Sequence, residues 1–226
     1  YGHSFNPPPL SQVYRYSDIV KANPNLDPER SDSFEIGLKK EWNTKTTLNV
    51  SGFYVKTKDK IKYVTYYDRN GDVDYKMYNN VDLETRRGIE LEVRHKLSSK
   101  WSVFGNYTWQ MGRIKHKELP NTNTNEYTEI NYDIPKHIFH AGLEYTSGKW
   151  NALWDTQYVS RRQSVDDITG QYGSEDSYFI SNVAVNYIWS KEATLQLGIQ
   201  NVFNRIFYND EATAGRTYSA SMKFKF

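Results

Sequence analysis

Histidines, carboxylates and serines are the side chains in this sequence that could bind a metal or catalyse a reaction, and their spacing favours neither. The 226 residues include five histidines and no cysteine, which excludes a thiolate metal site, a cysteine nucleophile and a disulfide framework. His137 and His140 are a close pair, but on a strand this spacing places them on opposite faces. No glycine-rich phosphate loop, calcium-binding loop or Ser/His/Asp arrangement can be recognised. We therefore predict no catalytic residue, no metal site and no cofactor, and we do not expect an enzyme.

Other residues suit the binding of a ligand rather than its conversion. Tyrosines and arginines gather in the polar segments 59–80, 113–136 and 161–176, where a solvated loop is the alternative for each of them. Tyrosine rings beside guanidinium and ammonium groups favour a flat, anionic, hydrogen-bonding ligand. The candidates for ligand binding are Tyr66, Tyr67, Arg69, Tyr78, Arg113, His116, Tyr127, Arg161 and Arg162.

The elements that must position these residues are strands. In residues 88–97 the apolar Ile89, Leu91 and Val93 alternate with charged residues, which is the period of a strand with one apolar face. Eight further stretches alternate in the same way, and no amphipathic helical period of useful length is present. The nine predicted strands cover residues 32–42, 46–54, 88–97, 101–111, 139–145, 150–158, 179–189, 195–203 and 217–226, and the tail of a tenth lies around residues 1–3.

The connections between these strands alternate in length. Tight polar turns at 43–45, 98–100, 147–149 and 190–192 are separated by long polar segments at 5–30, 59–80, 113–136, 161–176 and 204–215. In an antiparallel up-and-down sheet, all short turns then lie at one end and all long loops at the other. This segregation is typical of outer-membrane barrels. The pattern therefore predicts an all-β fold, an antiparallel up-and-down transmembrane β-barrel.

Composition excludes several other classes of protein. The net charge of +2 provides no general attraction for nucleic acid, and 19 Tyr, 10 Phe and 6 Trp are too many aromatics for a disordered chain. Mean hydropathy is −0.81, and no apolar run approaches the length of a membrane helix. Trp and Tyr border the apolar faces of the predicted strands, as they do in the aromatic girdles of membrane barrels. We expect the apolar faces to contact lipid and the charged faces to line the lumen.

Four segments carry a resemblance to a known family. They are NPNLDPERSDSFEIG at 23–37, GIELEV at 88–93, IQNVFN at 199–204 and GRTYSASMKFKF at 215–226. In this order they resemble segments of the barrel of TonB-dependent outer-membrane receptors. The first fourteen residues resemble a further family segment, although Asn6 and Gln12 replace its usual Arg and Glu.

The resemblance implies that residues 1–226 are the C-terminal portion of such a barrel, about the last ten of its 22 strands. It further implies that the N-terminal plug domain and first strands are absent, so that the chain forms an open curved sheet. The last strand resembles the signal read by the outer-membrane assembly machinery, a strand edge with aromatic anchors. The expected anchors are Tyr218, Met222, Phe224 and Phe226.

The family also implies a function and a location. The receptor would lie in the outer membrane of a Gram-negative bacterium, contact its lipid, and import a scarce nutrient, for which we expect a ferric siderophore. The TonB energy-coupling complex would act through the missing N-terminal region, and no nucleic acid is expected as a partner. Haem, cobalamin and glycans remain alternative ligands, and the absence of histidine from residues 5–26 disfavours haem. Two other classes stay open: a soluble β-rich carbohydrate-binding domain and a membrane barrel enzyme.

Overall fold

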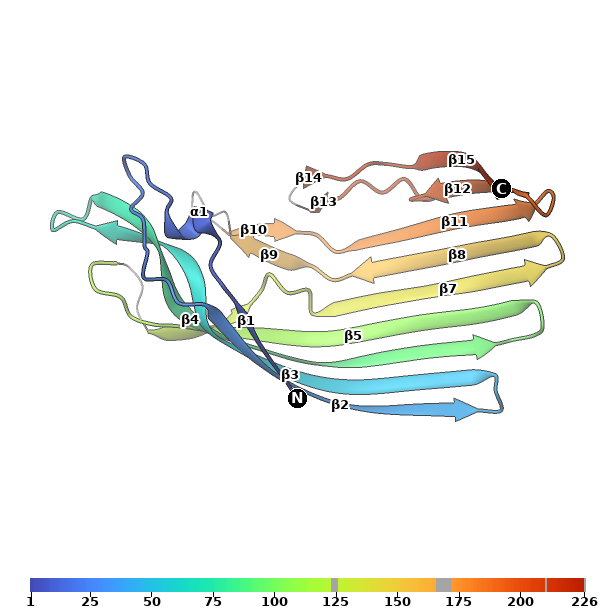
Figure 1. Cartoon of the computed structure of the whole chain (residues 1–226), viewed down its shortest axis with the longest axis horizontal. Helices are drawn as coiled ribbons and strands as arrows, with labels where there is room; N and C mark the ends of the chain where they lie inside the picture. Colours follow the sequence, from blue (N-terminus) through green and yellow to red (C-terminus); the bar gives the residue numbers. More distant parts are fainter. Residues whose placement is uncertain (123–125, 166–171, 210, 226) are drawn as a thin grey trace.

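The computed structural model describes residues 1–122, 126–165, 172–209 and 211–225. Within them the chain is built almost entirely of antiparallel strands (Figure 1). One helical turn, α1 (Leu10–Val13), interrupts the N-terminal segment. No helix of the described residues is long and apolar enough to cross a membrane.

Eleven strands form one sheet in the order β1-β2-β3-β4-β5-β7-β8-β11-β12-β15, and β6 pairs with the far end of β5. Two short hairpins, β9 with β10 and β13 with β14, stand apart from this sheet. The bounds are β1 (Gly2–Asn6), β2 (Glu29–Trp42), β3 (Thr46–Tyr67), β4 (Val73–Lys96), β5 (Trp101–His116), β6 (Tyr127–Asn131), β7 (His137–Ser147), β8 (Trp150–Val159), β9 (Arg162–Val165), β10 (Tyr172–Glu175), β11 (Tyr178–Ile188), β12 (Ala193–Gln200), β13 (Tyr208–Asn209), β14 (Glu211–Ala212) and β15 (Thr217–Phe224).

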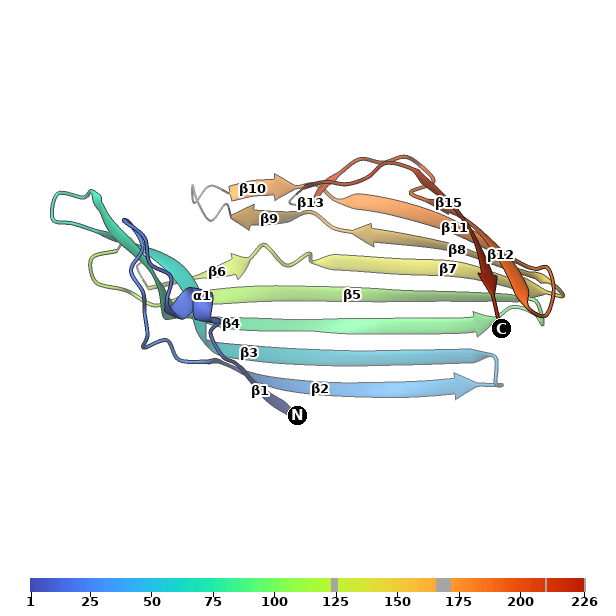
Figure 2. The same ribbon diagram turned by 45° about the horizontal axis from the view of Figure 1, so that its top comes forward.

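The sheet is open. β1 and β15 form its two edges, and no ladder joins them within the described part of the chain. Both views show a curved, single-layered sheet whose first and last strands lie apart (Figures 1 and 2). The expectation of an open partial barrel is therefore confirmed, as is the tenth strand predicted at the N-terminus.

Short and long connections lie at opposite ends of the sheet, as the sequence predicts (Figure 1). The long segments are not simple loops, however. Residues 59–80 were expected to form one, but β3 and β4 continue through them as a hairpin that turns only around Asp68, whose carboxylate accepts hydrogen bonds from the Asn70 and Asp72 amides. Cross-strand tyrosine pairs stabilise this extension and outweigh its polar composition.

The C-terminal strands are shorter than predicted. The strand expected at 195–203 ends at Gln200, because Asn201 adopts a positive φ of 52° and turns the chain. The Asn201 amide group holds this turn by donating to the carbonyl of Arg205 and accepting from the Arg205 amide. The last strand was expected to reach Phe226, but β15 ends at Phe224, and Phe226 lies outside the described residues.

The register confirms the alternation of faces. Leu38, Val50, Leu91 and Tyr107 are consecutive partners across four strands and share one face, which we call the apolar face. The neighbouring row, which includes Glu92, lies on the polar face. The sheet is a single layer, so no second sheet among the described residues packs on the apolar face, and Ile36 there is 80% exposed. A contiguous apolar surface of this kind requires lipid or a partner. A soluble β-rich domain, which would bury this face in a core, is thereby excluded as a fold.

On the polar face a phenylalanine covers a glycine of the next strand, and this arrangement occurs twice. The ring of Phe53 lies over Gly88, and the guanidinium of Arg86 stands 5.3 Å from that ring. In the same way Phe104 covers Gly142, with Arg94 at 5.1 Å from the ring. A Cβ added at Gly88 would lie only 2.6 Å from the Phe53 ring and 2.4 Å from the Trp109 carbonyl oxygen.

Gly88→Val is therefore expected to lower the free energy of unfolding by about 1–3 kcal/mol, since the ring and the backbone must both shift. Gly52→Val is the matched control, because a Cβ there meets only the Gly88 carbonyl at 3.9 Å. Urea unfolding of the two variants in lipid vesicles measures the difference. Equal stabilities would show that the Phe53 ring moves away without cost.

Candidate functional site at the mouth

The end of the sheet with the long connections, which we call the mouth, carries the residues predicted to bind a ligand. The extended hairpin of β3 and β4 rises beyond the other strands there, and the segment between β1 and β2 lies against it (Figure 2). This segment adds a parallel bridge between Val20 and Lys76. The Lys76 amide donates to the Ile19 carbonyl at 2.7 Å, and the Lys21 amide donates to the Lys76 carbonyl at 2.9 Å. The hairpin is thus supported along its otherwise free edge.

The NPNLDPE segment fastens the base of the hairpin. The Asn23 side chain donates to the Tyr78 carbonyl at 2.8 Å. The Asn80 side chain donates to the Asp27 carbonyl at 2.8 Å and accepts from the Asp27 amide at 2.9 Å. The Glu29 carboxylate accepts from the Ile61 amide where the β3–β4 register shifts. These motif residues therefore position the hairpin through hydrogen bonds to its backbone and side chains.

Two tyrosine pairs run along the hairpin. Tyr63 and Tyr78 have ring centroids 4.8 Å apart, and Tyr66 stacks on Tyr75 at 4.6 Å. The two pairs lie on opposite faces of the hairpin because their positions on β3 differ by three residues. The Lys21 ammonium stands 3.4 Å from the Tyr75 ring centroid. Burial, with a smaller contribution from Tyr75, raises the pKa of Tyr66, so this phenol stays protonated.

Arginine and lysine extend the cationic character of this surface. Arg15 lies 5.9 Å and Lys76 lies 5.8 Å from the Tyr63 ring. Aromatic faces with cations beside them can stack on a flat ligand and attract its negative charge. The hairpin therefore offers a binding surface rather than a reactive centre.

A buried ionic network lies below the hairpin, where β4, β5 and β6 meet. Asp82 is 0% and His116 is 4% exposed. His116 Nδ1 lies 3.0 Å from Asp82 Oδ1, and its Nε2 lies 2.8 Å from Glu129 Oε1, so the ring bridges two carboxylates. Lys62 Nζ lies 3.0 Å from Asp82 Oδ2, and Tyr127 stacks on the imidazole at 4.4 Å.

Glu84 continues this network. Lys60 forms an ion pair with it, and Asn131 Nδ2 donates to Glu84 Oε1 at 2.7 Å. Asp82 and Glu84 belong to the same face as Glu90, because the β4–β5 register is regular from Asp82 onward. The network therefore lies on the polar face. No group of three or more His, Asp or Glu side chains in the described ranges has an arrangement suited to a metal ion.

The structure brings only some of the predicted residues together. His116 and Tyr127 are in contact, whereas Tyr66 and Tyr78 lie on opposite faces of the hairpin. Arg113 is exposed on the apolar face, opposite to His116, and cannot line the same surface. The remaining candidates are Tyr67, whose amide donates to the Asn121 carbonyl; Arg69, in the hairpin turn; Arg161, which donates to Ser174; and Arg162, which pairs with Glu175.

The sequence did not point to Asp82, Glu129 or Lys62 as parts of the site. One signal could have identified Asp82. Asp82 and Glu84 lie an even number of residues before Glu90 and Glu92, so they would share the polar face if the strand predicted from residue 88 began earlier. The partners of Asp82 come from other strands, and their register could not be predicted from alternation alone.

The residues predicted as an assembly signal lie on one strand edge. Tyr218, Met222 and Phe224 project from the same face of β15 and are exposed. β12 pairs with one side of β15, and the other side has no partner strand within the part of the chain that the structure describes. Phe226 is the fourth predicted anchor and lies outside the described residues.

Comparison with known proteins gives a consistent result. Residues 1–202 match the family model for the TonB dependent receptor-like β-barrel. The chain is 21% identical over 199 residues to the catecholate siderophore receptor Fiu of Escherichia coli K12, covering 86% of this chain and 24% of that protein. It is 22% identical over 212 residues to the ferric-pyoverdine BN7/BN8 receptor of Pseudomonas putida, covering 91% and 24%.

Solved structures agree on the fold. The ferric enterobactin receptor PfeA of Pseudomonas aeruginosa superposes with a TM-score of 0.75 at 15% identity, covering 99% of this chain and 37% of that one. The chain thus spans about a quarter of the length of the curated relatives that it matches.

Proposed function

This chain belongs to the family of TonB dependent receptor-like β-barrels, and from that premise we propose that it is the C-terminal part of a receptor that imports a ferric siderophore. Barrels of this family lie in the outer membrane of Gram-negative bacteria and are transporters rather than enzymes. The apolar face of the sheet is accordingly the lipid-facing surface, and the end with long connections is extracellular.

We propose that a plug domain and the first strands of the barrel precede this chain in the whole receptor. The unpaired edges of β1 and β15 support this proposal, because a membrane barrel leaves no open edge in lipid. The coverage of the relatives supports it as well, since about three quarters of their length has no counterpart here. The TonB complex would then act through the preceding part, and the outer-membrane assembly machinery would bind the β15 edge through Tyr218, Met222, Phe224 and Phe226.

The observation that carries the ligand assignment is the tyrosine hairpin with its adjacent cations. A ferric siderophore carries flat chelating groups and negative charge, which suit the Tyr66–Tyr75 stack and Lys21 beside it. We propose that the ligand contacts this stack, with Arg69, Tyr127 and Arg161 at the rim of the mouth. Arg162 instead holds Glu175 within the β9–β10 hairpin, and His116 positions Tyr127.

Arg69→Glu combined with Arg161→Glu is expected to slow uptake of a ⁵⁵Fe-labelled anionic catecholate about tenfold in cells producing the whole receptor, because two attractive charges become repulsive. Lys191→Glu, in a short turn at the other end of the sheet, is the matched control. The double variant must be as abundant in the outer membrane as the parent receptor, so that slower uptake does not reflect less receptor. Unchanged uptake by the double variant would place the ligand contacts in the preceding part of the receptor.

A further inference from the structure

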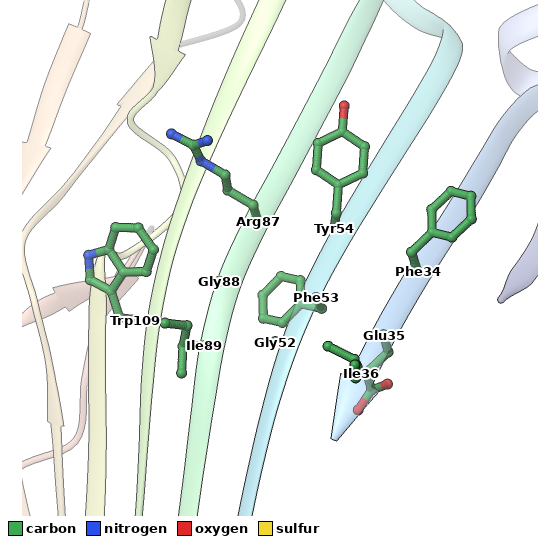
Figure 3. Close-up of a pocket in the computed structure, with 10 residues that line it drawn as sticks. All are labelled: Phe34, Glu35, Ile36, Gly52, Phe53, Tyr54, Arg87, Gly88, Ile89 and Trp109. Carbon is green, nitrogen blue, oxygen red and sulfur yellow. The ribbon is translucent and has the colours of Figure 1, made fainter. Parts of the chain in front are cut away.

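A shallow hollow of about 570 Å³ lies on the apolar face over strands β2 to β5. Its floor is Gly52, whose partners across the sheet are Ile36 and Ile89. Figure 3 shows Gly52 between these two side chains, with Trp109 beyond Ile89. Phe34, Tyr54 and Arg87 border the hollow toward the mouth. A glycine among large apolar residues leaves a groove the width of a side chain, open to lipid.

Arg87 marks the upper border of the lipid-facing band. Leu97 follows β4 directly, and its amide donates to the Trp101 carbonyl at the short-turn end. From Leu97 back to Arg87 the chain runs about 34 Å, which is about 26 Å along the membrane normal at barrel tilt. This distance equals the height of the apolar band of an outer-membrane barrel, about 25 Å. Arg87 therefore stands at the level of the outer-leaflet headgroups, and the Gly52 hollow lies just below, at the level of the acyl chains.

Further cations share this face above Arg87. Lys56 and Arg113 are both partners of Thr85, one on each side of it, and Arg87 follows two residues along the same strand. Lys56, Arg87 and Arg113 therefore surround the Thr85 position. One row higher, Arg30 lies directly opposite Lys58. Like charges in direct cross-strand positions repel each other unless an anion lies between them.

These cations are only partly neutralised by the protein itself, because Asp32 lies directly opposite Lys56 and also attracts Lys58. Within the described ranges, no ion pair involves Lys56, Arg87 or Arg113, and the same holds for the Arg30–Lys58 pair. The neighbouring acids are already occupied: Asp32 accepts hydrogen bonds from Tyr1 and His3, and Glu126 pairs with Lys115. Since the whole chain carries only +2, this cluster is a local concentration of charge.

We propose that this surface binds a phosphorylated lipid of the outer leaflet, with a phosphate among Lys56, Arg87 and Arg113 and an acyl chain in the Gly52 hollow. The charges suit an anionic headgroup, and the apolar hollow directly beneath them suits the attached chain. A soluble anion would gain nothing from the hollow. The surface lies on the opposite face from the buried network, so lipid binding and siderophore import can be tested separately.

The test uses the whole receptor in nanodiscs titrated with bis-phosphorylated lipid A, and with lipid A of the same acyl chains after removal of both phosphates. Arg87→Gln combined with Arg113→Gln is expected to weaken binding of the phosphorylated form about tenfold or more and to reduce its salt dependence. Lys96→Gln, on the polar face of β4, is the matched control and is expected to bind like the parent.

Gly52→Leu separates the two halves of the site. Filling the hollow is expected to weaken binding of both forms of lipid A, while the preference for the phosphorylated form remains. A Cβ at position 52 meets no atom closer than 3.9 Å, so the new side chain can enter the hollow without a backbone clash at its base. Equal binding of the two lipid forms by the parent receptor would overturn the proposal, as would unchanged binding by the arginine double variant.

Discussion

Asp82→Ala is expected to lower the free energy of unfolding by about 3 kcal/mol, because it breaks a buried ionic network. The Asp82 side chain is fully buried and faces both His116 and Lys62. Its removal leaves the buried imidazole with one carboxylate partner and Lys62 with none at this position. Lys62 is 40% exposed and can turn toward water, which keeps the loss near the lower end of the range for broken buried pairs.

Glu126→Ala is the control for this prediction, because Glu126 pairs with Lys115 on the surface near the same strands. The hydrogen bond from Lys115 lowers the pKa of Glu126, yet both side chains are exposed to water, so loss of this pair should change the stability far less than loss of Asp82. Chemical unfolding of the whole receptor in lipid vesicles measures both variants. Similar losses for the two would mean that the buried network contributes no more than a surface ion pair.

Leu91→Lys is expected to destabilise the receptor in a bilayer by about 2–4 kcal/mol, since Leu91 lies near the middle of the lipid-facing band. Its row partners Val50 and Tyr107 are also on the apolar face, so the ammonium would have no anionic partner in that row. Glu92→Lys, one residue away on the polar face, should change stability little. Folding into vesicles at increasing urea concentration distinguishes them, and equal tolerance would reverse the assigned orientation.

Strand alternation and turn spacing were sufficient to predict the architecture. A strand with one apolar face has a period of two, and this period is visible in Ile89, Leu91 and Val93 without any knowledge of neighbours. The lengths of β3 and β4 could not be predicted in this way, because beyond Tyr54 the sequence no longer alternates between apolar and polar residues. Tyrosine pairing across the hairpin stabilises that part, and such pairing depends on a register that includes shifts near Lys60.

The mouth was predicted in composition but not in arrangement. His116 was identified as a candidate, whereas its partner Asp82, 34 residues away in sequence, was not. Each residue of a cross-strand pair follows the alternation of its own strand, and the register between the two strands decides which residues meet. Arg113 illustrates the same limit. Its segment was identified correctly, but its position in the alternation of β5 places its side chain on the apolar face, with Lys56 and Arg87.

The unusual length of the β3–β4 hairpin also determines how accessible its turn is to large molecules outside the cell. From Tyr54, at the border of the lipid-facing band, to Tyr67 the strand extends up to about 44 Å. Its tip, the turn at Asp68, therefore projects above the membrane farther than a typical lipid headgroup. An antibody raised against this turn would bind intact cells and leave the sheet below it undisturbed. The hairpin would serve as an epitope and as a site for inserting a peptide tag.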